Sequence, residues 1–349
     1  MQTAFRWYGH SDRVPLGWLR QMTPRPLVVT HLSHVPPGEP WPLADLRALR
    51  VELAAHELEL GPVESVFWTD DMKLGRPDRN VHIENYLHTL ARLREAFPEP
   101  DELIVTYNLM PLDWGRTALA HLHPNGTRGM AYDHQAMART DLSHGLFLPG
   151  WSRRYSATEF AALKQAYADL GTDGFWSNVR YVLAALVPAA AAHGIRLAAH
   201  PNDPPWSYLG LPAFLSKAAD IRRLLALYPH RANALCFCTG SYGADPANDI
   251  PGMIREFKDS LAWMHLRTVK TTGEKCFHEA DHADLTANVD LLAVMRTLLA
   301  VGWDGVFRSD HGLDLLYESD IVTNGYPAID RYAANKMLWA YQHALKNGA

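Results

Sequence analysis

The sequence is short of cysteine, of excess charge and of long apolar runs, and each shortage excludes a class of protein. Three cysteines cannot cross-link a chain of 349 residues, which indicates a reducing compartment. The formal net charge of −5 lacks the positive excess that is typical of nucleic-acid-binding proteins. The longest apolar stretch, Val182–Ala192, is interrupted by Pro188 and is shorter than the roughly 18–20 residues that a membrane span needs. We therefore expect no nucleic-acid partner and no membrane segment.

The amino-terminal segment Met1–Trp7 lacks the basic region and apolar core of a secretory signal, so we expect a cytoplasmic protein. What the sequence has instead is a globular composition, with 48% hydrophobic and 20% charged residues. Its length fits two domains of about 150 residues or one α/β barrel of about 250 residues with insertions. Histidine is abundant, at 18 residues, which points towards metal or acid–base chemistry without locating it.

Eight short apolar segments, each ending in polar or turn residues, are typical of buried strands. Between them lie longer segments with apolar residues at every third or fourth position, which predicts amphipathic helices. The predicted strands are Thr3–Tyr8, Leu27–Leu32, Gly61–Phe67, Leu103–Asn108, Arg196–His200, Ala234–Cys238, Leu261–Leu266 and Gly305–Ser309. The predicted helices are Pro42–Leu60, Val81–Phe97, Ser177–His193, Leu211–Tyr228 and Asn288–Val301.

Buried strands that alternate with amphipathic helices indicate an α/β protein with a parallel sheet. Eight such units favour a closed (β/α)8 TIM barrel, formed by residues 1–349 as a single domain, over the alternative of an open doubly wound sheet. Residues 111–174 are too many for one crossover and are rich in Gly, His, Arg and Asp. We interpret them as an insertion, or cap, after the fourth strand. Such insertions usually cover an active site or form an oligomer contact.

Four consecutive predicted strands end in residues that can bind a metal ion. The loops after the carboxyl ends of barrel strands build the active site, so His200, Cys238, His265 and Asp310 are expected to meet at one rim. Two imidazoles, a thiolate and a carboxylate can hold a divalent cation and leave room for a substrate. Each residue alone also has an ordinary interpretation, as a core histidine, a buried cysteine or a capping aspartate. Their shared position on adjacent strands favours the metal site.

The alternation of side chains along a strand selects Cys238, rather than Cys236, as the ligand. If Cys238 faces the barrel mouth, Cys236 faces the same way one layer deeper. Phe237, between them, then faces the surrounding helices.

Several longer motifs occur in a fixed order along residues 1 to about 340, with few gaps. They are Phe5-Arg6-Trp7-Tyr8-Gly9, Tyr107-Asn108-Leu109-Met110-Pro111, Asp113-Trp114-Gly115-Arg116-Thr117, His200-Pro201-Asn202-Asp203-Pro204-Pro205, Cys238-Thr239-Gly240-Ser241-Tyr242-Gly243, Phe277-His278-Glu279-Ala280 and Asp310-His311-Gly312. In these motifs the sequence resembles the mannonate dehydratases of hexuronate breakdown. Their length and number make the resemblance specific.

The resemblance implies a xylose-isomerase-like TIM barrel that binds one Mn²⁺ and converts D-mannonate to 2-keto-3-deoxy-D-gluconate, a hydro-lyase reaction. It implies the four metal ligands named above, and it places the acid–base residues on His311 and Tyr326. The alternatives for these two are that His311 only orients Asp310 and that Tyr326 only packs the last helix. A thiolate ligand taken alone favours Zn²⁺ or Fe²⁺, with Co²⁺ also possible, so Mn²⁺ rests on the resemblance. The resemblance also implies a homo-oligomer, a dimer or higher.

Residues at other strand ends are candidates for binding the substrate, a small sugar acid. Arg6 and Arg267 can form a bidentate pair with its carboxylate, or instead a salt bridge with a neighbouring acidic residue. Asn108 can bond a sugar hydroxyl or close a loop. Glu64, at the end of the third strand, is expected to orient a ligand histidine from behind.

Five positions depart from the family pattern and are expected to line the substrate mouth: Ser33, Phe67, Trp68, Thr69 and Leu313. The metal site is intact while the pocket is altered, so the sequence leaves the true substrate open. The main hypothesis is dehydration of D-mannonate or a close analogue. The alternatives are a metal-dependent lyase or isomerase for a different sugar or polyol acid, and a non-catalytic metal-retaining sugar-acid binder.

Overall fold

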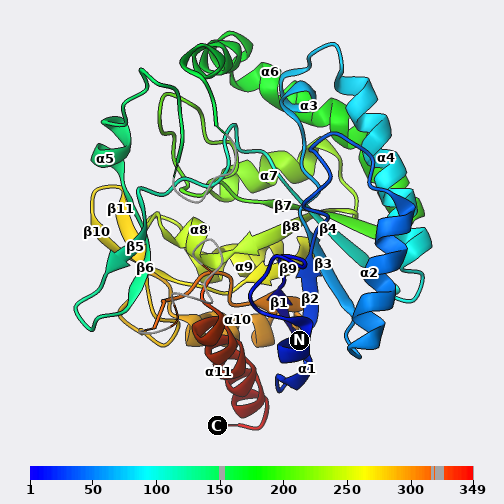
Figure 1. Cartoon of the computed structure of the whole chain (residues 1–349). Coiled ribbons are helices and arrows are strands. Elements are labelled where there is room, and N and C mark those ends of the chain that lie inside the picture. The colour runs from blue at the N-terminus through cyan, green and yellow to red at the C-terminus, as the bar shows by residue number, and fades with distance from the viewer. Residues whose placement is uncertain (149–153, 316–317, 319–325, 349) are drawn as a thin grey trace.

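The computed structural model describes residues 1–148, 154–315, 318 and 326–348, and they form a closed barrel of eight parallel strands (Figure 1). Around the barrel the strands follow the order β1-β12-β9-β8-β7-β4-β3-β2. Each of the eight predicted strands overlaps one of them, so the predicted TIM barrel is confirmed and the open sheet is wrong. The strand bounds are β1 Gln2–Arg6, β2 Leu27–Thr30, β3 Leu60–Glu64, β4 Leu103–Asn108, β7 Ile195–His200, β8 Asn233–Cys238, β9 Leu261–His265 and β12 Val306–Arg308.

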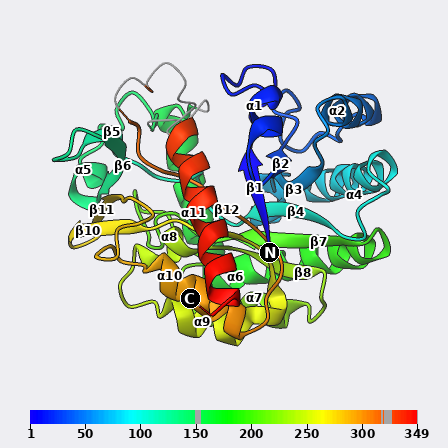
Figure 2. The ribbon, with the colours of Figure 1, turned by 90° about the horizontal axis from the view of Figure 1, so that it is seen from below.

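Helices surround the barrel, and short helical turns stand at several strand ends (Figures 1 and 2). The longer helices are α1 Leu16–Gln21, α2 Leu43–Ala55, α4 Arg79–Ala96, α6 Ala157–Ala192, α7 Ala218–Leu227, α9 Ile250–Phe257, α10 Leu291–Ala300 and α11 Ala328–Lys346. The short ones are α3 Asp70–Leu74, α5 His134–Ala138, α8 Thr239–Gly243 and the 3-10 turn η1 Lys258–Ser260.

The start predicted for the helix after β7 is wrong. The apolar pattern predicts a helix from Leu211, but α7 begins at Ala218. The side-chain oxygen of Asn202 accepts hydrogen bonds from the amides of Phe214 and Leu215, at 3.0 Å each. These bonds satisfy the backbone in a loop conformation, so the local polar contact overrides the helical pattern.

The helix before β7 also differs from its predicted bounds, because it starts at Ala157 rather than Ser177. Ser156 and Glu159 form a capping box that satisfies the first free amides of the helix. Gly171 interrupts the helix with a φ of 64°, so α6 consists of two helical parts across a kink. The predicted helix corresponds to the second part.

A second, smaller sheet lies beside the barrel, at the left of Figure 1. Its antiparallel strands follow the order β10-β11-β6-β5. Two of them come from the long segment after β4, and two come from the loop after β9. The sheet therefore joins two connections that are distant in sequence. Its bounds are β5 Ala118–Leu122, β6 Arg128–Asp133, β10 Val269–Gly273 and β11 Cys276–Glu279.

Side chains alternate between two apolar cores. Cys236 and Trp263 belong to the small cluster inside the barrel, while Phe237 belongs to the large cluster between strands and helices. The alternation predicted along β8 is thus confirmed. Inside the barrel the Trp263 indole donates a 3.0 Å hydrogen bond to Thr106 Oγ1, which satisfies the one polar atom of this large buried ring.

The last helix fixes the strand end that precedes Asp310. The Asn335 side chain accepts a 2.9 Å hydrogen bond from the Ser309 amide and donates a 3.0 Å bond to the carbonyl of Ala4. These bonds tie α11 to both β12 and β1, and α11 lies along this side of the barrel in Figure 2.

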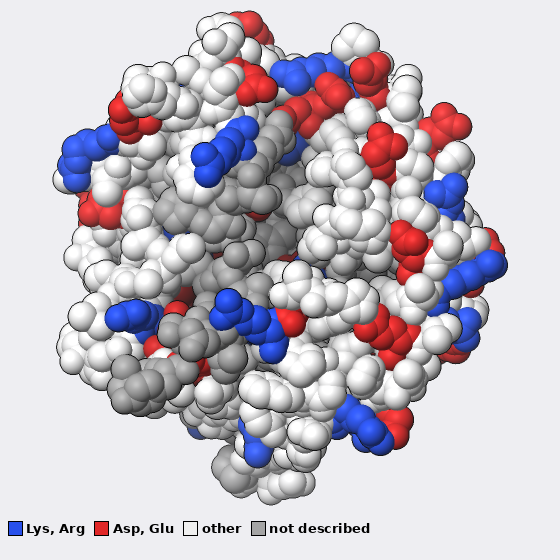
Figure 3. Space-filling view, viewed as in Figure 1, with Lys and Arg blue, Asp and Glu red and all other residues white. Residues whose placement is uncertain are grey.

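In the described part of the chain no helix is both long enough and apolar enough to cross a membrane. On the face shown in Figure 3, basic and acidic side chains are interspersed around the rim. Charges of both signs close together largely cancel one another's field at a distance.

Candidate metal centre

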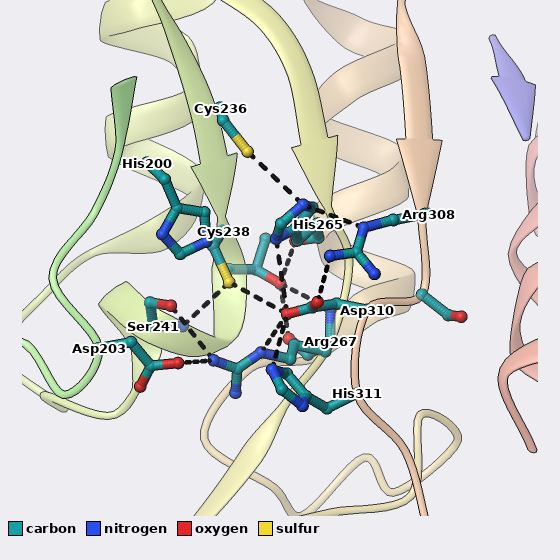
Figure 4. A network of polar contacts seen from close by, with 12 residues as sticks. His200, Asp203, Cys236, Cys238, Ser241, His265, Arg267, Arg308, Asp310 and His311 are labelled. Atoms are coloured by element: carbon teal, nitrogen blue, oxygen red, sulfur yellow. Dashed lines mark hydrogen bonds and ion pairs between the residues drawn. The ribbon is translucent and has the colours of Figure 1, made fainter. Parts of the chain in front are cut away.

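Three potential metal ligands meet at the carboxyl ends of adjacent strands (Figure 4). His200 ends β7, Cys238 ends β8 and His265 ends β9. Their ligand atoms all lie within 4.8 Å of one another. Asp310, just after β12, is close by, with Oδ2 3.5 Å from His265 Nδ1 and 3.8 Å from Cys238 Sγ. The barrel therefore assembles a mixed nitrogen, sulfur and oxygen donor set from four stretches of the chain.

The two histidines present free ring nitrogens to the centre. His200 Nδ1 lies 2.8 Å from the carbonyl of Pro201, so Nδ1–H donates there and Nε2 remains available. His265 Nε2 lies 3.3 Å from Glu64 Oε1 and accepts a 3.1 Å hydrogen bond from Arg308 Nε, while its Nδ1 faces Asp310 Oδ2 at 3.5 Å. An outer bond on one ring nitrogen that leaves the other free is the usual arrangement of metal-binding histidines.

The charged groups favour ionised ligands. Burial alone raises the pKa of the Cys238 thiol, but Arg267 and hydrogen bonds with His200 and His265 outweigh it and lower the pKa to about 5. Burial also opposes ionisation of Asp310, yet His311, His265 and Arg308 hold its pKa well below the usual range. At neutral pH the centre therefore offers a thiolate and a carboxylate. Burial and Arg308 oppose protonation of His265, but Cys236, Asp310 and Glu64 outweigh them and raise the pKa of this ring well above its usual value, so a bound cation must displace a proton from it.

Asp310 and His311 face the mouth because the chain turns sharply after β12. Asp310 has a φ of 58°, a left-handed conformation that few residues other than glycine, asparagine and aspartate adopt. His311 Nε2 lies 3.5 Å from Asp310 Oδ2, and its Nδ1 is buried with no partner among the described residues. The His311 ring stacks on Tyr326, with centroids 4.4 Å apart. Two acid–base groups thus lie side by side next to the candidate ligands.

Behind the ligands lies a buried network of arginines and carboxylates that the sequence reasoning missed. Arg267 bonds Asp310 at 2.8 Å, Asp203 at 2.6 Å and Glu279 at 3.1 Å. Arg116 bonds both oxygens of Asp203, at 2.9 and 3.0 Å, and Glu279 at 3.0 Å. The resembling motifs contain Arg116, Asp203 and Glu279, but nothing in their spacing shows that they meet.

The formal charges of this network fit a divalent cation. Its ion pairs join four carboxylates to three guanidinium groups, and the Cys238 thiolate adds a fifth anion. With the histidines neutral, as metal binding requires, five negative charges against three positive ones leave −2, which one divalent cation would neutralise. The carboxylates are Glu64, Asp203, Glu279 and Asp310, and the guanidinium groups are those of Arg116, Arg267 and Arg308.

Replacing Arg116 with methionine is expected to lower the free energy of unfolding by about 3–5 kcal/mol, because it removes one of the two guanidinium groups that neutralise the buried carboxylates of Asp203 and Glu279 and leaves both to share Arg267. Arg116 is completely buried, and its pair with Asp203 is bidentate. Chemical denaturation of the variant measures the loss. Arg128→Met, at an exposed position of β6, is the control and should unfold like the parent protein. Equal stability of the two variants would contradict the role of the buried network.

Glu64 lies behind His265, where it also pairs with Arg308 at 2.8 Å. Replacing Glu64 with glutamine removes the charge that orients the ring, and it is expected to weaken metal binding about 10–100-fold. Glu59→Gln, on the exposed surface before β3, is the matched control. Titration of both apo-proteins with Mn²⁺ by calorimetry gives the two affinities. An unchanged affinity in Glu64→Gln would show that the carboxylate does not support the centre.

The residues predicted to bind the substrate differ in whether their side chains are already paired with carboxylates of the protein. Arg267 is occupied by three carboxylates, which is the salt-bridge alternative left open by the sequence. Arg6 contacts His31 Nδ1 and the carbonyls of Trp7 and Val29, and no carboxylate in the described part of the chain lies within 4.0 Å of it. Asn108, the last residue of β4, lies opposite His200 in the pairing of β4 with β7. Of the two arginines, only Arg6 retains charge that a substrate carboxylate can use.

The five altered positions do not all line the mouth. That prediction is wrong for Trp68, whose buried ring stacks on Tyr107 at 4.5 Å, on the side of β4 that faces the helices. It is also wrong for Thr69, whose hydroxyl caps α3 by accepting from the Met72 amide. Both residues lie beyond the end of β3, where local packing and the start of α3 set the direction of their side chains.

The remaining three positions lie elsewhere. Phe67 is 36% exposed, and its ring meets His31 edge-on at 6.4 Å. Ser33 is exposed on the loop after β2. Leu313 is buried against Gly129 of β6, where an added Cβ would lie 2.8 Å from Leu313 Cδ2. Phe67 is therefore the altered side chain that most directly changes the surface beside Arg6 and His31.

The barrel carries a His–Cys–His cluster that could hold a metal ion, beside a stacked histidine and tyrosine, at the carboxyl ends of its strands. This arrangement is typical of metal-dependent barrel enzymes. The family model described as D-mannonate dehydratase (UxuA) matches residues 1–349. The chain therefore belongs to the mannonate dehydratase family, a family of hydro-lyases.

Individual proteins agree with this assignment. The chain is 36% identical to mannonate dehydratase 2 of Halalkalibacterium halodurans over 316 residues, covering 89% of this chain and 90% of that protein. Mannonate dehydratase 1 of the same organism is 33% identical over 359 residues, covering 100% and 98%. The crystal structure of mannonate dehydratase from Streptococcus suis serotype 2 superposes with a TM-score of 0.87 at 30% identity, covering 99% of this chain and 94% of that one.

A more distant structure shows the fold alone. A xylose isomerase domain protein from Planctomyces limnophilus superposes with a TM-score of 0.54 at 12% identity, covering 99% of this chain and 98% of that one. The xylose-isomerase-like form of the TIM barrel, expected from the sequence, is thereby confirmed.

Proposed function

We propose that the protein dehydrates D-mannonate to 2-keto-3-deoxy-D-gluconate with one bound Mn²⁺. The observation that carries this proposal is the convergence of His200, Cys238 and His265 beside the stacked pair of His311 and Tyr326. We assign the fourth ligand position to Asp310. The free ring nitrogens, the low thiol pKa and the formal charge of −2 around the centre support binding of a divalent cation here.

The reaction removes the proton on C2 of the aldonate and expels the hydroxyl on C3. The C2 proton is weakly acidic because the neighbouring carboxylate resists further negative charge. When bound, the cation would supply Lewis-acid stabilisation of the negative charge that develops on the substrate oxygens. The chain itself must supply a base that reaches C2 and an acid that protonates the leaving hydroxyl.

We assign the base to His311 and the acid to Tyr326. Burial, together with Arg267 and Arg116, holds the pKa of His311 well below its usual value against the opposing charge of Asp310, so the ring is neutral and can accept a proton. Burial and the neighbouring Tyr8 and Asp310 raise the pKa of Tyr326 well above its usual value, so the phenol keeps its proton and can donate it. The two environments push the two groups towards opposite roles.

We assign recognition of the substrate carboxylate to Arg6, and a hydroxyl contact to Asn108. Arg6 is held by backbone carbonyls and by His31, so its guanidinium is ordered before substrate arrives. In this proposal Arg267 acts on the centre instead, by bonding Asp310 and lowering the pKa of Cys238.

The identity of the metal is tested by activity of the apo-protein reloaded with single metals. A thiolate ligand suits Zn²⁺ and Fe²⁺ as well as Mn²⁺, and Co²⁺ is a further candidate. We expect the highest turnover of D-mannonate with Mn²⁺. Higher turnover with Zn²⁺, Fe²⁺ or Co²⁺ would reassign the metal but leave the site in place.

A second candidate function is the same chemistry on a different sugar or polyol acid. It is favoured by the exposed Phe67 ring, which lies against His31 beside Arg6. A panel of aldonates with Mn²⁺, read for 2-keto acid formation, separates the two. Product from D-mannonate supports the first proposal, and product only from another acid supports the second. Bound metal with no product from any acid would support a non-catalytic binder.

We also propose a cytoplasmic homo-oligomer in which residues 111–174 form a cap over the barrel. The three cysteines are free, which suits a reducing compartment. Arg116, within these residues, bonds Asp203 and Glu279, which both pair with Arg267, so this segment already contacts the network behind the centre. Light scattering during size exclusion tests the oligomer, and a single monomeric mass would contradict it.

A further inference from the structure

The turn formed by residues 309–313 carries both Asp310 and His311, and its backbone has already left the barrel sheet. The Arg308 carbonyl, at the end of β12, still accepts a 2.8 Å hydrogen bond from the Leu266 amide. Asp310 then has a φ of 58°, a conformation that persists only where neighbouring groups hold it. Asp310 and His311 therefore keep their places at the centre (Figure 4) only if the turn itself is fixed.

The first end of the turn is held by His282, a buried residue in the loop after β11. His282 Nε2 lies 2.8 Å from the Ser309 carbonyl, so Nε2–H donates there. That carbonyl belongs to the peptide group that precedes Asp310, and fixing it fixes the plane about which the Asp310 backbone turns. The Ser309 amide and hydroxyl are bonded by Asn335 and Arg331 of α11 instead. The carbonyl is thus the part of Ser309 that His282 orients.

The other end of the turn is held by Asp330, near the start of α11. Its Oδ2 accepts a 2.8 Å hydrogen bond from the Leu313 amide. A Cβ on Gly312 would lie 2.1 Å from the same oxygen, so the carboxylate packs directly on the turn and only glycine leaves room for it. Asp330 Oδ2 also lies 3.9 Å from His282 Nδ1. The histidine and the aspartate therefore face each other while each bonds one end of the turn.

The loop that carries His282 is tied to the network behind the centre. Glu279, three residues before His282, bonds Arg116 at 3.0 Å and Arg267 at 3.1 Å. Arg267 in turn bonds the Asp310 carboxylate at 2.8 Å. The chain after β9 thus fixes Asp310 twice, through its side chain by Arg267 and through the preceding carbonyl by His282.

We propose that His282 and Asp330 are positioning residues, which hold residues 309–313 so that Asp310 reaches the metal and His311 reaches the substrate. We call the two residues the turn clamp. The inference rests on the proposed function, because it takes Asp310 as a ligand and His311 as the base. The clamp acts only through the turn, yet its effect on rate is large, since a misplacement of about 1 Å can cost roughly 10²-fold.

Amide hydrogen exchange of the full chain, resolved to single residues, tests whether the clamp holds the turn. The His282→Leu substitution does not touch the Leu313 amide, but it is expected to raise the exchange rate of that amide about 10-fold, as loss of one hydrogen bond from a cooperative unit would. His282→Gln keeps an N–H donor and should restore the parent rate. His82→Leu is the matched control, because its ring pairs with another carboxylate, Asp71, at 3.1 Å. Parent-like exchange in His282→Leu would overturn the proposal.

Steady-state kinetics with D-mannonate at saturating Mn²⁺ test whether the clamp serves the reaction. His282→Leu and Asp330→Ala are expected to lower kcat about 10–100-fold and to change KM by less than about twofold, because Arg6 still binds the substrate. His282→Gln and Asp330→Asn, which keep the donor and the acceptor oxygen, should regain most of the rate. A merely structural role would lower the Tm without this division between kcat and KM.

The two tests also separate failure of the clamp from failure of the proposed function. Faster exchange at Leu313 with unchanged kcat in both His282→Leu and Asp330→Ala would overturn the clamp as a positioning device. If the parent protein itself does not turn over D-mannonate, the proposed function is wrong, while the exchange rates still support or overturn the hold of His282 on the turn.

Discussion

Replacing Cys238 with serine is expected to remove the ion from the barrel centre and, with it, turnover. In the proposed centre the thiolate is the one soft anionic ligand, whereas a serine hydroxyl stays protonated at neutral pH. The loss of affinity should exceed the 10–100-fold that is typical when only an outer hydrogen-bond partner of a metal ligand is removed. Mn²⁺ titration of the apo-protein measures the affinity, and 2-keto acid formation measures turnover.

Two other cysteines supply the controls for this substitution. Cys276→Ser alters a half-buried thiol on β11, away from the centre. Cys236→Ser alters the thiol one layer below, on the same strand and facing the same way. Both should keep Mn²⁺. If Cys238→Ser binds Mn²⁺ as tightly as these controls do, the thiolate is not a ligand.

Replacing His311 with asparagine, or Tyr326 with phenylalanine, is expected to lower kcat by about 10²–10⁴-fold while Mn²⁺ binding is retained. Each change removes a proton-transfer group, and Tyr326→Phe also keeps both rings of the stacked pair, which are tilted by 27°. Full activity in both variants would show that the acid–base assignment is wrong. Loss of Mn²⁺ in His311→Asn would instead mean that His311 supports Asp310.

The pH dependence tests which of the two is the base. A base must be unprotonated, and the pKa of His311 lies well below its usual value because the ring is buried near Arg267 and Arg116. Turnover should therefore persist as the pH falls below the ordinary histidine range, and decline only as the pH approaches the lowered pKa. If the decline follows the ordinary histidine pKa near 6.5, His311 is not held neutral in the working enzyme.

Much of the barrel could be predicted because its signals are local. Apolar segments with polar ends mark each strand, and parallel strands bring those ends to one rim. The same logic placed His200, Cys238 and His265 at neighbouring positions. Alternation put Cys236 and Cys238 on one face, and the position of Cys238 at the strand end told the two apart. These inferences need only the strand order, not the detailed path of any loop.

The contacts that could not be predicted from the sequence depend on the paths of the loops and on which side chains are long enough to meet. Arg116 and Glu279 stand on different connections, and they meet only because the small sheet joins the segment after β4 to the loop after β9. Trp68 resembled a pocket residue because its loop follows a strand end, but its ring stacks on Tyr107. The segment before α7 has the apolar spacing of a helix, but hydrogen bonds from its backbone amides to the Asn202 side chain hold it as a loop.

The most direct test of the metal centre is anomalous diffraction at the manganese absorption edge, from crystals of the parent protein grown with Mn²⁺. We expect one strong peak within bonding distance of His200, Cys238, His265 and Asp310. A barrel mouth that stays without a peak at saturating Mn²⁺, or a peak from which the Cys238 sulfur points away, would contradict the proposed metal centre.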